Sequence, residues 1–184
     1  MSEPDSLYLR VRLSKQAYQR YLASPCADAR DFSDWMDWVG KAQMYGSGIT
    51  ANDIREIGER SSKRMTSEEV DAWATDAWNI GKSDYDEATE TWRFGMLQFS
   101  ENYYDFLEHL PVFRAVDRFK DRPGVDFLLV HNFLWSPDDY VVFFEMTEGR
   151  SVIAGSPGQG VDFPAAYAEE AATFLTSFIP PGNR

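Results

Sequence analysis

The sequence has few of the residues from which most recognisable sites are built. It contains one cysteine, Cys26, and two histidines, His109 and His131. A single cysteine excludes an intramolecular disulfide and a cysteine-based metal cluster. Such cysteine usage favours a reducing compartment.

Long apolar runs are also missing. The longest, at residues 127–130 and 140–144, are far shorter than the roughly 20 residues of a membrane-spanning helix. The first residues lack the basic stretch and apolar stretch of a signal peptide. We therefore expect a cytoplasmic protein that does not insert into a membrane.

Basic residues are outnumbered. Lys and Arg total 18 against 30 Asp and Glu, which gives a net charge of −12. Binding to free nucleic acid is disfavoured, because affinity for phosphate backbones comes from Lys and Arg. A cationic protein would be attracted to this surface. The alternative is that the acidity serves solubility alone.

Aromatic residues, in contrast, are abundant, with 13 Phe, 9 Tyr and 6 Trp. Their apolar area is ample for a packed core. The length of 184 residues favours one domain spanning 1–184. We expect its ends, 1–5 and 180–184, to be flexible.

The hydrophobic pattern predicts both strands and helices. Residues 7–13 alternate as a half-buried strand does, helices follow up to residue 80, and residues 91–99 form a second strand. Three further strands are predicted at 125–135, 140–146 and 150–154, before a final helix over 164–179. This order indicates an α+β fold with a mainly antiparallel sheet of about four to five strands. The last strands form a meander, and the helices pack largely on one face.

Motifs that could carry chemistry are weak. The glycine-rich loop at 155–160 follows a strand but lacks the Lys-Ser/Thr of a phosphate-binding loop. Asp105 and His109 are one helical turn apart, yet two ligands do not make a metal site. His131 lies among apolar strand residues, as a core histidine does. No serine or cysteine has the setting of a hydrolase nucleophile. We expect no cofactor, no metal and no catalytic activity.

The distribution of charge is the most informative feature. Residues 66–91 hold eight acidic residues and one basic residue, Lys82. A capping box at residues 66–69 predicts a helix over 66–80, whose acids, Glu69 among them, project away from a stripe that includes Val70 and Trp73. A polar loop over 82–90 follows.

This segment is either a solvated surface or a docking surface for a basic protein, which would associate rapidly and in a salt-sensitive manner. Trp38 and Trp78 lie at the edges of their helical stripes and would be interface anchors if exposed. A second acidic run surrounds Arg30. The predicted partner-binding residues are Asp71, Asp76, Trp78, Asp84, Tyr85, Asp86, Glu87 and Glu90.

Segments such as SLYLRVRLSKQAYQRYL, TWRFGMLQFSENYYDFL and HNFLWSPDDYVVFFEM are typical of the chain. In this general character it resembles bacterial immunity proteins. Immunity proteins neutralise toxins delivered by type VI secretion, by contact-dependent inhibition or as bacteriocins. The resemblance implies a non-catalytic protein that binds a basic toxin or effector domain, and it assigns no role to individual residues.

Two other functions remain open at this stage. A secretion chaperone or adaptor would also be an acidic α+β protein, but it would bind an apolar segment of its client and show weak salt dependence. An enzyme of unfamiliar type would need a deep pocket that gathers His131 with carboxylates of perturbed pKa.

Overall fold

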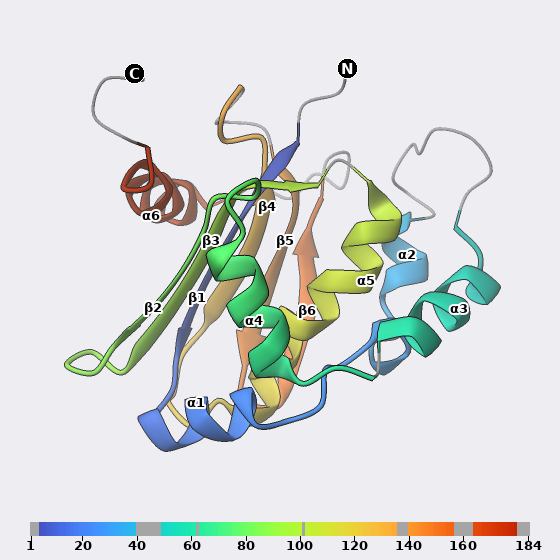
Figure 1. Ribbon diagram of the computed structural model, residues 1–184, viewed down its shortest axis with the longest axis horizontal. Helices are drawn as coiled ribbons and strands as arrows, with labels where there is room; N and C mark the ends of the chain where they lie inside the picture. Colours follow the sequence, from blue (N-terminus) through green and yellow to red (C-terminus); the bar gives the residue numbers. More distant parts are fainter. Residues whose placement is uncertain are drawn as a thin grey trace.

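The computed structural model describes residues 4–39, 49–61, 63–100, 102–135, 140–156 and 164–179. Within them the chain forms an α+β fold around a six-stranded antiparallel sheet with the strand order β2-β3-β1-β4-β5-β6. Helices α1 to α5 lie on one side of the sheet and α6 lies on the other (Figure 1). The predicted fold class is therefore confirmed.

The strands are β1 (Asp5–Arg12), β2 (Gly81–Asp86), β3 (Thr91–Ser100), β4 (Asp126–His131), β5 (Tyr140–Thr147) and β6 (Arg150–Gly155). The helices are α1 (Lys15–Leu22), α2 (Trp35–Val39), α3 (Ala51–Ser61), α4 (Thr66–Thr75), α5 (Tyr103–Arg114) and α6 (Ala165–Thr176). Two short 3₁₀ helices, η1 (Ala29–Asp31) and η2 (Ala115–Phe119), complete the described elements.

Strand β1 lies at the centre of the sheet, between β3 and β4. Leu7, Leu9 and Val11 belong to the main core beneath the helices. Tyr8 belongs to a second core, which α6 covers with Ala171 and Leu175. The predicted alternation is confirmed. Because α6 covers the opposite face, this part of β1 is buried on both sides rather than half-buried.

The structure corrects two predictions in the acidic segment. Residues 81–86 form an edge strand, β2, where a loop was predicted, so the sheet has six strands rather than four to five. The helix predicted over 66–80 ends at Thr75. The remaining residues of that stretch form a turn and enter the sheet.

Several sequence predictions fall outside the described residues. These are residues 1–3 and 180–184 of the expected flexible ends and residues 157–160 of the glycine-rich loop. Asp5, also expected in a flexible end, is already the first residue of β1. None of the helices in the described segments combines the length and apolar character needed to cross a membrane.

Candidate functional site

The acidic segment begins on α4 and turns sharply into β2. Asp76 follows the helix in an extended conformation, and its Oδ1 accepts hydrogen bonds from the backbone N–H groups of Trp78 (2.7 Å) and Asn79 (3.1 Å). Ile80 then adopts a φ of 50°, an uncommon conformation for a β-branched residue. This turn replaces the last part of the predicted helix and directs the chain into the sheet.

Trp78 is carried by this turn and projects into solvent. Its side chain is 79% exposed, whereas a tryptophan is usually largely buried. Trp38, the other tryptophan considered as an anchor, is 1% exposed and packs against Tyr103 and Phe106. Of these two tryptophans, therefore, only Trp78 is available to a partner.

Strand β2 forms one edge of the sheet. Its side chains alternate between the two faces, as successive strand residues must. Lys82 lies over the rings of Phe174 and Phe178, on the side of α6. Asp84, two residues on, lies on the same side and is exposed. Opposite it in the register is Arg93 of β3.

Tyr85 points to the other face and is held there. Its hydroxyl donates a hydrogen bond to the backbone carbonyl of Leu13 (2.9 Å), its ring stacks on Tyr18 at 4.9 Å between centroids, and Lys15 covers it at 4.7 Å. Burial, reinforced by Glu90 and Glu87, raises the pKa of Tyr85. Tyr85 thus fixes β2 against α1, and little of its ring remains to anchor a partner.

The turn between β2 and β3 carries the last three predicted acids. The Asp86 carboxylate accepts hydrogen bonds from the backbone N–H groups of Ala88 (2.8 Å) and Thr89 (3.3 Å). Hydrogen bonds from Thr89 and Ala88 lower the pKa of Asp86. Glu87 forms an exposed ion pair with Lys15. Asp86 therefore closes the turn while remaining charged.

Glu90 ends the same turn with a φ of 49°. Its carboxylate accepts two hydrogen bonds from the Arg122 guanidinium, at 2.5 and 2.8 Å. This bidentate pair lowers the pKa of Glu90. Glu90 thus links the β2–β3 turn to the segment after η2.

The eight predicted residues therefore follow one stretch of the chain, from α4 on one side of the sheet through the turn at Trp78 and along the edge strand β2 to the next turn (Figure 1). We call these residues the β2-edge surface: Asp71, Asp76, Trp78, Asp84, Tyr85, Asp86, Glu87 and Glu90. The side chains of Asp71 and Asp84 have no hydrogen bond or ion pair within the described part of the chain. The other acids of this surface form hydrogen bonds or ion pairs within the chain.

One acidic residue that the sequence predicted to be exposed is buried. Glu69 was expected to project from α4 into solvent. It is 3% exposed, forms a 2.7 Å ion pair with Arg64 and lies 3.3 Å from Nδ1 of His109. This side of α4 faces His109 of α5, which sequence periodicity could not reveal.

The second acidic run has a structural role. Asp28 pairs with Arg30, and Asp31 lies 3.6 Å from Arg118. Asp34 accepts two hydrogen bonds, at 2.9 and 2.8 Å, from Arg114, which is fully buried. These residues stabilise the fold where α2, α5 and β6 meet.

The histidines do not assemble a site. Asp105 accepts a hydrogen bond from Ser100 (2.8 Å) and is not joined to His109. His131 is 1% exposed on β4. In the described ranges, no group of three or more His, Cys, Asp or Glu residues could hold a metal ion.

Two charged cavities lie elsewhere, and neither is lined by a histidine. One, of about 300 Å³, includes Asp34, Arg114 and Asp117. The other, of about 520 Å³, lies beside α6 and includes Arg10, Arg12 and Arg93. Sequence reasoning missed this arginine group, although the alternation of Tyr8, Arg10 and Arg12 already placed three polar groups on one face of β1.

Comparisons with protein-family models, with curated proteins and with solved structures returned no match for this chain.

Proposed function

We propose that this protein is a non-catalytic immunity protein that neutralises a cognate bacterial toxin in the cytoplasm. It would do so by direct contact through the β2-edge surface. The observation that carries the proposal is the exposed Trp78 in the middle of a strongly acidic segment. An exposed aromatic anchor surrounded by carboxylates suits a basic protein partner.

The acidic residues of the β2-edge surface and Trp78 have separate roles in the proposed complex. The acids of the β2-edge surface steer a cationic partner, which raises the association rate at low ionic strength. Trp78 supplies apolar contact area once the partner has arrived. Asp71 and Asp84 are the acids best suited to close ion pairs, because neither has a partner within the described chain.

The edge position of β2 supports a docking role as well. An edge strand presents unpaired backbone groups, and natural proteins protect such edges with charged side chains. Here Lys82, Asp84 and Asp86 alternate along the strand. A basic partner can neutralise the two carboxylates, whereas a second copy of this acidic chain would be repelled.

The two alternative functions have less support. A chaperone needs an apolar groove for its client, and both cavities described above are lined largely by charged and polar residues. An enzyme built around His131 needs that side chain in an open pocket, and His131 is buried.

The proposal is tested by capturing the partner of the tagged protein from its native cells. The captured protein is then expressed alone, and also together with this chain. We expect a basic protein that arrests growth when expressed alone, with growth restored by co-expression. A captured partner without toxicity, or the absence of a stoichiometric partner at low salt, contradicts the proposal.

A variant pair tests the surface itself. Asp71→Lys with Asp84→Lys should abolish the rescue of growth. The matched control is Glu56→Lys with Glu59→Lys, which makes the same change of charge on the exposed side of α3. Equal rescue by both double variants would exclude the β2-edge surface as the docking site.

A further inference from the structure

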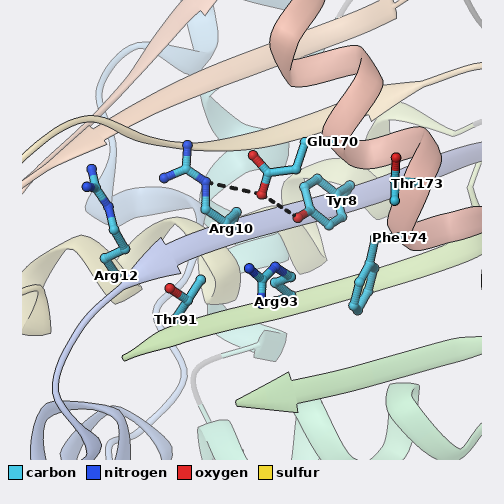
Figure 2. A pocket seen from close by; sticks show the side chains of 8 residues that line it. All are labelled: Tyr8, Arg10, Arg12, Thr91, Arg93, Glu170, Thr173 and Phe174. Atoms are coloured by element: carbon cyan, nitrogen blue, oxygen red, sulfur yellow. Dashed lines mark hydrogen bonds and ion pairs between the residues drawn. The ribbon is translucent and has the colours of Figure 1, made fainter. Parts of the chain in front are cut away.

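The cavity beside α6 places basic residues close together on the sheet. Arg10 and Arg12 extend from β1 and Arg93 from β3, on the side of the sheet that carries α6 (Figure 2). The register pairs Arg10 directly with Arg93 and Arg12 with Thr91. Two arginines that face each other across neighbouring strands repel, so this pairing is unfavourable unless an anion lies between them.

The positive charge of Arg10 is better balanced by nearby carboxylates than that of Arg93. The Nη1 of Arg10 donates a hydrogen bond to Oδ1 of Asp126 (2.5 Å), and its Nε lies 3.4 Å from Oε1 of Glu170. That same Glu170 oxygen accepts a hydrogen bond from the Tyr8 hydroxyl (2.9 Å), as the dashed lines in Figure 2 show. One carboxylate oxygen of Glu170 thus accepts a hydrogen bond from Tyr8 and forms an ion pair with Arg10.

The carboxylate of Asp126 is likewise shared between several cations. This buried group contacts Arg10, Arg12 (3.0 Å) and Lys120 (2.7 Å). Together with Arg93, this makes four cations against two carboxylates, Asp126 and Glu170. The ion pairs of the cluster alone thus leave two cations unbalanced, and the nearest further carboxylates, Asp84 and Asp86, lie beside Arg93 without an ion pair to it.

Arg93 has no ion pair or hydrogen bond to any side chain in the described ranges, although it is only partly exposed. Asp84 lies opposite it in the register, yet no ion pair joins the two. Asp86, which is also near, directs its carboxylate to the backbone N–H groups of its own turn. The guanidinium of Arg93 is therefore available to a ligand.

The walls of the cavity suit an anion that carries an apolar body. Phe174, which is partly exposed, lines the cavity and packs against the buried ring of Tyr8 at 5.4 Å between ring centroids. Thr91 and Thr173 also line the cavity, and their hydroxyl groups donate to the backbone carbonyls of Thr89 (3.1 Å) and Glu169 (2.9 Å). The volume of about 520 Å³ exceeds that of a phosphate ion and lies within the range of small-molecule sites.

We propose that this cavity binds a small organic anion, with its phosphate or carboxylate group held by Arg93, with Arg10 and Arg12 adding positive charge nearby, and with its apolar body against Phe174. An arginine guanidinium binds such groups through two parallel hydrogen bonds. The site is independent of the proposed toxin partner, because it rests on different residues and on the opposite charge.

The test is an NMR titration of the full chain at 150 mM NaCl with phenyl phosphate and, separately, with inorganic phosphate. We expect saturable shifts of the backbone amides of Arg10, Thr91 and Arg93 with both probes. Phenyl phosphate should bind more tightly, because its ring contacts Phe174. The absence of saturable shifts with both probes would overturn the proposal, and equal affinity would overturn the role of the aromatic wall.

Variants of Arg93 make the test specific. Arg93→Gln should weaken phenyl phosphate binding about tenfold or more, since it removes a charged pair of donors. Arg93→Lys should bind with intermediate affinity, because the charge remains and the planar fork is lost. Arg20→Gln on the exposed side of α1 is the control with the same change of charge. Equal affinities of Arg93→Gln and Arg20→Gln would show that binding is not at this site.

Discussion

Gly81, the first residue of β2, lies against the backbone carbonyl of Trp73 in α4, so closely that a Cβ atom at Gly81 would be 2.0 Å from that oxygen. No side chain fits at this distance, and the obstacle is backbone that cannot rotate away. The contact fixes where α4 ends relative to β2, and thereby positions the turn that carries Trp78.

Gly81→Ala should therefore separate α4 from β2. We expect the free energy of unfolding to fall by about 1–3 kcal/mol, the usual cost of forcing extra volume into a packed contact. Urea denaturation measures this change. A fall of less than about 0.5 kcal/mol, the size of an ordinary surface substitution, would contradict the close packing of α4 on β2.

Trp78→Phe tests the exposure of the proposed anchor. Trp35, Trp38 and Trp92 are buried, whereas Trp78 is 79% and Trp135 57% exposed. We expect the variant to lose a large share of the fluorescence that acrylamide quenches, and to change the free energy of unfolding by less than about 0.5 kcal/mol. The control is Trp38→Phe, which removes a buried tryptophan and should leave the amount of quenchable fluorescence unchanged while it lowers stability. If acrylamide quenched Trp78→Phe as strongly as the wild type, the ring of Trp78 would lie in the interior, and the proposed anchor would be wrong.

Arg114→Ala should be strongly destabilising. The guanidinium is buried, is bound by Asp34, and lies over the rings of Phe32 (4.1 Å) and Trp35 (4.4 Å). Burial lowers the pKa of Arg114, and the bonds to Asp34 oppose that shift. Removing one partner of a buried pair costs about 3–5 kcal/mol.

The control for this prediction is Arg118→Ala. The ion pair between Arg118 and Asp31, at 3.6 Å, is exposed to solvent. We therefore expect Arg118→Ala to lower the free energy of unfolding by no more than about 1 kcal/mol. Urea denaturation of both variants gives the comparison. Equal losses would mean that the Arg114–Asp34 pair has no special structural role.

Cys26 should be nearly unreactive in the folded protein. Burial raises the pKa of its thiol to about 11, so at pH 8 only about one thiol in a thousand is ionised, and the thiolate is the reactive form. We expect Ellman's reagent to label the folded chain at least about 100-fold more slowly than the chain unfolded in urea. Comparable rates would indicate that Cys26 is exposed.

Much of the fold could be predicted because its signals are local. The alternation of Leu7, Leu9 and Val11 predicts β1, and the β-prone runs near the C-terminus predict the meander formed by β4, β5 and β6. Strand β2 gave a weaker signal. Only Ser83 and Tyr85 point towards the core side, and charged residues alternate with them, which is also the composition of a polar loop.

The sites depend on relationships that local patterns do not contain. The pairing of Arg10 with Arg93 requires β1 and β3 to be neighbours, and the order of strands in a sheet cannot be read from sequence periodicity. The burial of Glu69 depends on the packing of α4 near Arg64 and His109. The exposure of Trp78 depends on the end of α4 at Thr75, five residues before the predicted boundary.

The measurement that tests the central proposal most directly is the association rate of this protein with its captured partner as a function of ionic strength. Three proteins are compared by stopped flow: wild type, Asp71→Lys with Asp84→Lys, and the control Glu56→Lys with Glu59→Lys. We expect the wild-type and control rates to fall steeply with salt. The Asp71/Asp84 double variant should associate at least about tenfold more slowly at low salt, with a flatter salt dependence. Identical rates and salt dependences for the two double variants would contradict docking through the β2-edge surface.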